Sequence, residues 1–90
     1  MLLSELPRHV PASVESVVDA RLRDPIGRRL RELGFVKGEP VRVVTSGPFG
    51  GDPLVIEIGT SRFALRRAEA ARIRVHADAA SASTKVQGKA

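Results

Sequence analysis

The chain has no cysteine, tryptophan or tyrosine, and only three phenylalanines among its 90 residues. Without cysteine no disulfide can staple the fold, and the composition fits a reducing compartment. No apolar run approaches the roughly 20 residues that span a bilayer, and the N-terminal stretch lacks the basic and apolar regions of a signal peptide. These absences predict a cytoplasmic protein with one small domain.

Negative charge is also scarce, because ten acidic residues stand against fifteen basic ones and leave a net charge of +5. This balance raises nucleic acid, an acidic membrane surface and an acidic protein surface as partners, and it does not choose among them. Lys85 and Lys89 lie in a C-terminal stretch of small residues that has little to bury. We therefore predict a folded domain at residues 1–77 and a disordered tail at 78–90.

The clearest helix signal lies in residues 24–34, where Asp24 is a suitable N-cap and Pro25 suits the first helical position. Apolar residues recur at the spacing of one helix face, at Ile26, Leu30 and Leu33. Gly34 then ends the helix, and a Schellman motif would fold Phe35 back onto it. Leu30 is therefore expected in the core.

Gly27 stands inside this predicted helix, where glycine costs roughly 1 kcal/mol relative to alanine. A residue that weakens its own helix needs a reason in the packing. Our hypothesis is that a neighbouring strand approaches the helix closely at Gly27, so that a larger side chain would not fit.

Short alternating stretches precede and follow the helix. Residues 12–19 are rich in valine and break their alternation once, as a strand with a bulge does. Later strands are expected within residues 41–45, 54–58, 61–66 and 72–76, and single helical turns at 3–7 and 66–71. The side chains expected to point inward are Val41, Val43, Thr45, Leu54, Ile56, Ile58, Phe63, Leu65, Ile73 and Val75. Five strands with one α-helix inserted after the first predict a mainly β fold, a small β-barrel.

The glycine-rich stretch at residues 47–53 could be either a phosphate-binding loop or a turn between strands. A P-loop needs a lysine after its glycines and a helix behind them, whereas here Pro53 and an alternating strand follow. A hairpin fits better, with Gly50 and Gly51 supplying positive φ angles. Phe49 then lies at the turn, either packed back on the barrel or exposed as an anchor for a partner.

The sequence shows no constellation of catalytic or metal-ligating residues. His9 and His76 are far apart and neither has a second ligand at i+3 or i+4, which favours solvated histidines over a metal site. Serine, aspartate and histidine are scattered, and no nucleophile stands on a recognisable elbow. We expect no enzyme activity, no cofactor and no metal site of the chain's own, and adventitious zinc held between two copies by a histidine and a carboxylate stays open.

One combination of turns is specific. A leucine-rich helix ends in Leu-Gly-Phe, a Gly-Glu turn follows, then a Gly-Pro and Gly-Asp-Pro loop, then a Leu-Arg-x-x-Glu-Ala segment before the last strand. These features are carried by Leu30, Leu33, Gly34, Phe35, Gly38, Glu39, Gly47, Pro48, Gly51, Asp52, Pro53, Leu65, Arg66, Glu69 and Ala70. The pattern resembles the FeoA family of small bacterial proteins, accessory to the ferrous iron transporter FeoB. The resemblance covers residues 1–76, and the glycine loop is one residue longer than is common.

The resemblance implies a cytoplasmic SH3-like barrel without catalytic activity that binds the cytoplasmic, GTPase side of FeoB and regulates iron uptake. The partner-binding residues are then expected to be Phe49 and three arginines on the polar side of the helix, Arg28, Arg29 and Arg31. Charges on the rim of an interface chiefly raise the association rate. An ordinary solvated helix face is the alternative for the arginines. A weak homo-oligomer stays open, and membrane contact is expected only through the transporter.

A second hypothesis, from a different class, is a small basic barrel that binds nucleic acid, suggested by the charge and by the arginine-rich strand at 72–76. Single-strand binders use exposed aromatic rings as stacking platforms. Phe35 and Phe63 are assigned to packing, which leaves Phe49 alone. Affinity for oligonucleotides across salt concentrations would separate the two hypotheses, because nucleic-acid binding weakens steeply with salt.

Overall fold

The structure is a computed structural model that describes residues 1–77, apart from the side chain of Phe49. The tail predicted at 78–90 lies outside the described residues. The elements follow in the order η1 (Leu3–Glu5), β1 (Ala12–Val17), α1 (Pro25–Glu32), β2 (Pro40–Phe49), β3 (Asp52–Ile58), β4 (Ser61–Leu65), α2 (Arg67–Ala70) and β5 (Ile73–Ala77). This is the mainly β fold with one longer helix after the first strand that the sequence predicts. Among the described residues the longest helix, α1, has 8 residues, too few to cross a membrane.

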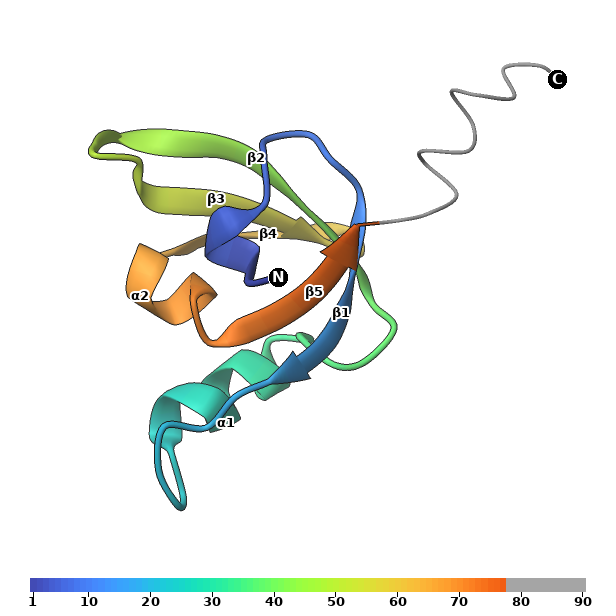
Figure 1. The fold of residues 1–90 in the computed structure, drawn as a ribbon, viewed down its shortest axis with the longest axis vertical. Helices are drawn as coiled ribbons and strands as arrows, with labels where there is room; N and C mark the ends of the chain where they lie inside the picture. The colour runs from blue at the N-terminus through green and yellow to red at the C-terminus, as the bar shows by residue number, and fades with distance from the viewer. Residues whose placement is uncertain (78–90) are drawn as a thin grey trace, which may run out of the picture.

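The strands form one antiparallel sheet of five in the order β4-β3-β2-β1-β5, which curls around the core (Figure 1). The chain start completes the outer edge of β5. The Met1 ammonium donates to the Val75 carbonyl at 3.1 Å, and the Val75 N–H donates to the Met1 carbonyl at 2.8 Å. The first residues of the chain are therefore part of the fold.

One hydrophobic core is built from every element of the fold. Its buried members are Leu3, Leu6, Ala12, Val14, Leu30, Phe35, Val41, Val43, Leu54, Ile56, Ile58, Leu65, Ala70, Ile73 and Val75. The predicted inward positions are among them except Thr45, which is exposed, and Phe63, which is half-buried and tilted against Phe35 at 6.3 Å between ring centroids. The core thus accounts for nearly all of the alternating pattern.

A second bulge explains why the prediction for Thr45 is wrong. Val43 pairs with Ile56 but Thr45 pairs with Val55, so β2 has one residue more than β3 at this point. The extra residue reverses the alternation and turns Thr45 outward. The bulge predicted in β1 is confirmed, since its register shifts between Val14 and Ser16.

Both ends of α1 follow the predicted capping chemistry. Asp24 Oδ1 accepts from the N–H of Ile26 at 3.0 Å. At the other end the Phe35 N–H donates to the Leu30 carbonyl at 3.1 Å and the Gly34 N–H donates to Arg31 at 3.0 Å, which is the Schellman pattern. These caps fix where α1 begins and ends, and so where its side chains lie.

The β2–β3 connection is a hairpin turn, as predicted. Phe49 pairs with Asp52 across the turn, and Gly50 and Gly51 have φ angles of 65° and 84°. Positive φ at both central residues is the requirement of a tight hairpin turn, and glycine meets it without steric cost. A strand follows the glycines where a phosphate-binding loop would need a helix.

Candidate protein-docking face

Two of the three predicted helix arginines hold α1 against the rest of the barrel. Arg29 Nη1 lies 3.0 Å from Glu69 Oε2 of α2. Arg31 Nη2 donates to the Asp19 carboxylate at 2.9 Å and to the Val17 carbonyl at 3.1 Å. These contacts join residues distant in sequence, so both arginines already have partners within the same molecule.

Arg28 is the most accessible of the three. Its partner is Glu32, one turn further along α1, at 3.2 Å between Nε and Oε2. The side chains of Arg28 and Glu32 are 81% and 65% exposed. An exposed pair of this kind contributes only about 0–1 kcal/mol, so Arg28 can exchange its partner at little cost.

The structure does not bring Phe49 together with these arginines. The backbone of Phe49 ends β2 at the hairpin turn, and its side chain lies outside what the structure describes. The hairpin and α1 lie toward opposite ends of the long axis of the molecule (Figure 1). The four residues predicted to bind a partner therefore belong to two elements that lie apart.

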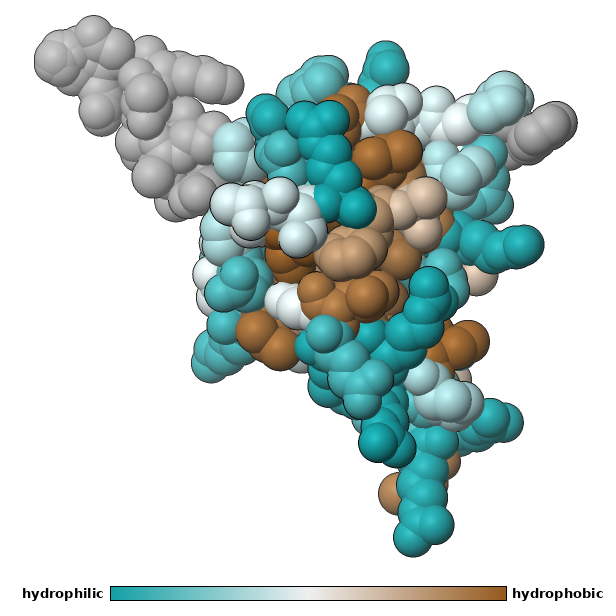
Figure 2. Space-filling view, turned by 180° about the vertical axis from the view of Figure 1, so that it is seen from behind, coloured by the Kyte–Doolittle hydropathy of each residue, from teal (hydrophilic) through white to brown (hydrophobic). Residues whose placement is uncertain are grey.

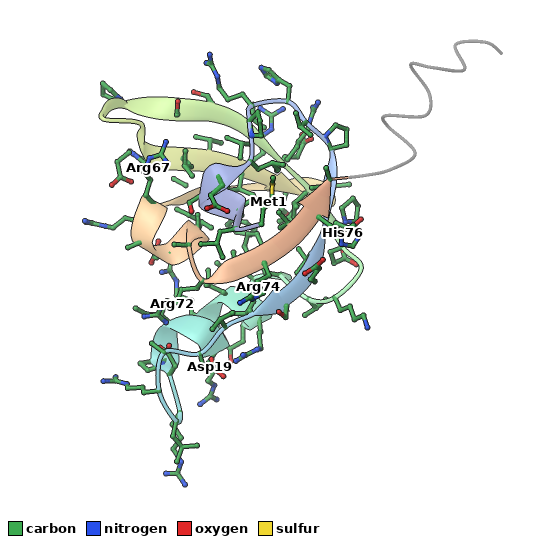
Figure 3. The ribbon with its side chains drawn as sticks, in the orientation of Figure 1. Met1, Asp19, Arg67, Arg72, Arg74 and His76 are labelled. Carbon is green, nitrogen blue, oxygen red and sulfur yellow. The ribbon has the colours of Figure 1, made fainter. Side chains whose placement is uncertain are left out.

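Asp24 organises the loop that leads into α1. It is 5% exposed. The Ala20 N–H donates to its Oδ2 at 2.8 Å, and the Arg72 guanidinium, from the segment before β5, pairs with the same oxygen. In Figure 3 the labelled Asp19 and Arg72 lie beside α1, and the loop extends below them. The carboxylate thus ties the loop to both the helix and the sheet.

These contacts shift the titration of Asp24. The pKa of its carboxyl lies below the ordinary value of 3.8, chiefly because the Ala20 N–H donates to it. Burial opposes the shift. The N–H groups of Ile26 and Gly27 and the charge of Arg72 lower the pKa further.

The loop tip, Arg21, Leu22 and Arg23, is the exposed feature that the sequence analysis misses. Leu22 is 90% exposed, and Arg23 has a φ of 57°. A hollow of about 560 Å³ lies beside this tip and is lined by Asp19, Arg23, Asp24, Pro25, Arg28 and Arg31. The triplet falls between the last alternating residue of β1 and the N-cap of α1, so no periodicity marks it.

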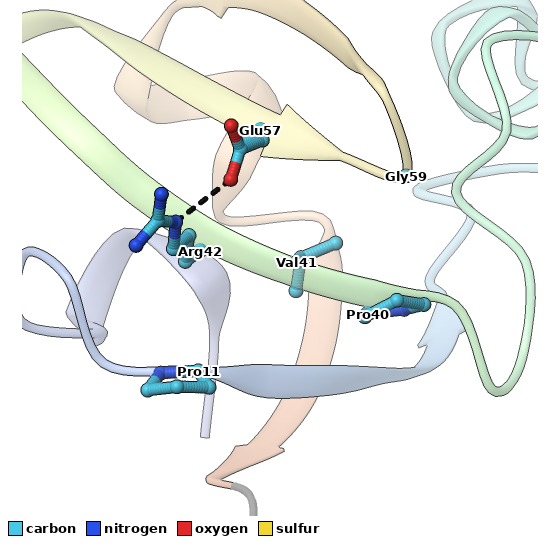
Figure 4. A pocket seen from close by; sticks show the side chains of 6 residues that line it. All are labelled: Pro11, Pro40, Val41, Arg42, Glu57 and Gly59. Carbon is cyan, nitrogen blue, oxygen red and sulfur yellow. Dashed lines mark hydrogen bonds and ion pairs between the residues drawn. The ribbon is translucent and has the colours of Figure 1, made fainter.

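On strands β2, β3 and β4 charged side chains form ion pairs with one another. Glu57 of β3 lies 2.7 Å from Arg42 and 3.3 Å from Arg62, and its pKa is lowered chiefly by the hydrogen bond from Arg42. Beside this cluster is a pocket of about 110 Å³ lined by Pro11, Pro40, Val41, Arg42, Glu57 and Gly59 (Figure 4). The pocket is well below the roughly 300 Å³ at which ligand sites begin.

The histidines lie apart from the loop tip. His76 Nδ1 is 3.0 Å from Glu15 Oε2, and His9 is exposed with a φ of 68°. Within residues 1–77 no group of three or more metal-ligating side chains lies together. The rear of the molecule carries apolar surface in its middle, with hydrophilic side chains around it (Figure 2).

The curled five-stranded sheet with its inserted helix is the small β-barrel that the sequence pattern predicts, and it has the SH3-like fold that the resemblance implies. A family model, the FeoA domain, matches residues 1–77. The chain belongs to the FeoA family. This family is associated with ferrous iron transport. A search of functionally curated proteins found no match.

Solved structures agree with this assignment. The FeoA protein of Stenotrophomonas maltophilia is 62% identical, with a TM-score of 0.78, and the match covers 90% of this chain and 93% of that one. That protein is described as an SH3 domain protein complexed with zinc and proposed as a bacterial ferrous iron transport activating factor. The FeoA protein of Chlorobium tepidum is 38% identical with a TM-score of 0.74, covering 86% and 70% of the two chains. Iron(II) transport protein A of Clostridium thermocellum is 34% identical with a TM-score of 0.75, covering 88% of this chain but 46% of that one.

Proposed function

We propose that this protein binds the cytoplasmic, GTPase-bearing side of a FeoB-type ferrous iron transporter and regulates iron uptake. The observation that carries the proposal is the match to the FeoA domain over residues 1–77, together with 62% identity to a FeoA protein proposed as a ferrous iron transport activating factor. The transporter is the partner that the resemblance to the FeoA family implies, so its cytoplasmic part is the first to test.

The exposed arginine Arg28 on α1 supplies the physical basis for docking. Arg28 is 81% exposed, and within residues 1–77 its one ion pair is the exposed pair with Glu32. A carboxylate on a partner can replace Glu32, because the pair in solvent contributes little. Charges placed this way act mainly on the association rate and on its salt dependence.

The test is binding of the purified cytoplasmic domain of the transporter to the full chain, with Arg28→Glu as the variant. Arg8→Glu is the matched control, because Arg8 is also exposed and lies beside Val43 of β2, away from α1. We expect binding by the unchanged chain, slower association for Arg28→Glu, and no change for the control. Absence of binding, together with normal iron uptake in a strain that lacks the protein, would refute the proposal.

A further inference from the structure

Leu22 is unusual among the exposed apolar residues of this protein. It is 90% exposed, whereas Met1, Val36 and Val18 are 54%, 45% and 40% exposed. Single apolar side chains on a surface are common and need no special explanation. What sets Leu22 apart is how the loop presents it.

The loop is fixed on both sides of its tip. The carboxylate of Asp24 accepts from the N–H groups of Ala20 and Ile26 at 2.8 and 3.0 Å, before and after the tip, and pairs with Arg72. The Val18 N–H also donates to the Arg72 carbonyl at 2.7 Å. The loop therefore has defined ends rather than a single tether.

The backbone at the tip is itself constrained. Arg23 has a φ of 57°, a conformation that residues other than glycine seldom adopt. Such a conformation persists where the surrounding contacts impose it, and it is frequent at binding sites. The anchored loop thus holds Leu22 away from the core.

The charges around Leu22 that form no ion pair within residues 1–77 are of one sign. The acidic side chains nearby are already engaged, since Asp24 pairs with Arg72 and Asp19 with Arg31. Arg21 and Arg23 form no ion pair with any residue of 1–77. The loop tip is therefore one apolar side chain between two uncompensated cations.

We infer that the loop tip docks into an apolar pocket bordered by carboxylates on the protein partner. The inference rests on the proposed function, so the pocket belongs to the cytoplasmic domain of the transporter. Leu22 would fill the pocket, while Arg21 and Arg23 would meet the acidic rim, as in interfaces with an apolar anchor and a polar border. A lipid surface fits less well, because stable attachment there needs a broad apolar face or a second anchor, and the tip offers one side chain.

The experiment measures the affinity of the cytoplasmic domain of the transporter for the full chain and for Leu22→Ser and Leu22→Met. We expect Leu22→Ser to weaken binding about tenfold or more, since it removes a side chain that would be buried in the complex. Leu22→Met keeps the volume and is expected to bind like the unchanged chain. Val36→Ser, at an apolar residue beyond the other end of α1, is the matched control and should not change the affinity.

The thermal midpoint of unfolding separates an effect on folding from an effect on binding. We expect the midpoint of Leu22→Ser to equal that of the unchanged chain. Replacing Arg21 and Arg23 by glutamine should lower the association rate and flatten its salt dependence.

Equal affinity of Leu22→Ser and the unchanged chain would overturn the docking inference alone. No binding by the unchanged chain would overturn it together with the proposed function. Loss of binding to phosphatidylserine vesicles in Leu22→Ser, with transporter binding intact, would replace the protein pocket by a lipid surface.

Discussion

The same tripeptide, Arg-Leu-Arg, occurs at residues 21–23 and 29–31 with opposite results. Leu30 is 0% exposed and Leu22 is 90% exposed. In α1, consecutive side chains point in different directions, so Leu30 enters the core while its two arginines reach Glu69 and Asp19 at either side. At the loop tip no helix separates the side chains in this way. The identity of the three residues therefore does not determine whether the leucine is buried. The backbone conformation does, and it places Leu30 in the core and Leu22 in solvent.

The largest expected effect breaks this comparison directly. Leu30→Ala should lower the free energy of unfolding by about 2–5 kcal/mol, because it leaves a cavity among fully buried neighbours. Leu22→Ala should change it by less than about 0.5 kcal/mol, as surface substitutions do. Urea unfolding followed by circular dichroism measures both. Similar losses at the two positions would mean that Leu22 also packs against the fold.

The next prediction concerns Asp24, the residue that joins the loop to α1. Its pKa is lowered by folding, so its contribution to stability is fully present above the ordinary value of 3.8. The contribution is lost as the pH falls through the lower folded value, because protonation then removes the charge that the Ala20 N–H and Arg72 stabilise. Asp24→Asn keeps a capping side chain but should destabilise the protein at neutral pH.

Unfolding measured from pH 7 downward checks this sign. The stability difference between the unchanged chain and Asp24→Asn should shrink in acid. Glu57→Gln is the control, because Glu57 also has a lowered pKa but lies on the sheet, so its effect should add to that of Asp24. A difference that stays constant from neutral to acid pH would show that the charge of Asp24 does not matter.

Capping residues and alternation predicted the fold because both are local rules. The two ends of α1 are predicted by Asp24, Gly34 and Phe35, and the bulge of β1 is predicted by the break in alternation. The outward turn of Thr45 could not be predicted, since it depends on how β2 pairs with β3. A bulge of that kind is visible only when both strands are in place.

The candidate site was less predictable than the fold. The sequence identifies Arg29 and Arg31 as polar helix positions, but their partners lie elsewhere in the chain, so the pairs follow only from the tertiary structure. Leu22 gives no signal because it belongs to neither a helix nor a strand pattern. The loop that carries it is tied down by Asp24 and Arg72, which meet only in the folded chain.

The contact between the loop and α1 can be tested at Gly27. A Cβ at this position would lie 2.1 Å from Asp19 Oδ1, so a side chain causes the close approach and the hypothesis of an approaching strand backbone is wrong. Gly27→Ala alone should change stability little, because a helix gain of about 1 kcal/mol is offset by displacement of the Asp19 carboxylate. In an Asp19→Ala background the gain of about 1 kcal/mol should appear. Unfolding of the four proteins forms a double-mutant cycle, and strict additivity would exclude the contact.

The smallest effects compare the arginines of the two tripeptides. Arg31→Ala should cost about 1 kcal/mol, because Arg31 loses both the Asp19 carboxylate and the Val17 carbonyl. Arg21→Ala should change the free energy of unfolding by less than about 0.5 kcal/mol, since Arg21 is exposed and has no ion pair within residues 1–77. Thermal unfolding of the two variants at low and high salt checks the contrast. If both cost the same, Arg21 holds the loop as Arg31 holds the helix, and the loop tip is structural rather than free to bind.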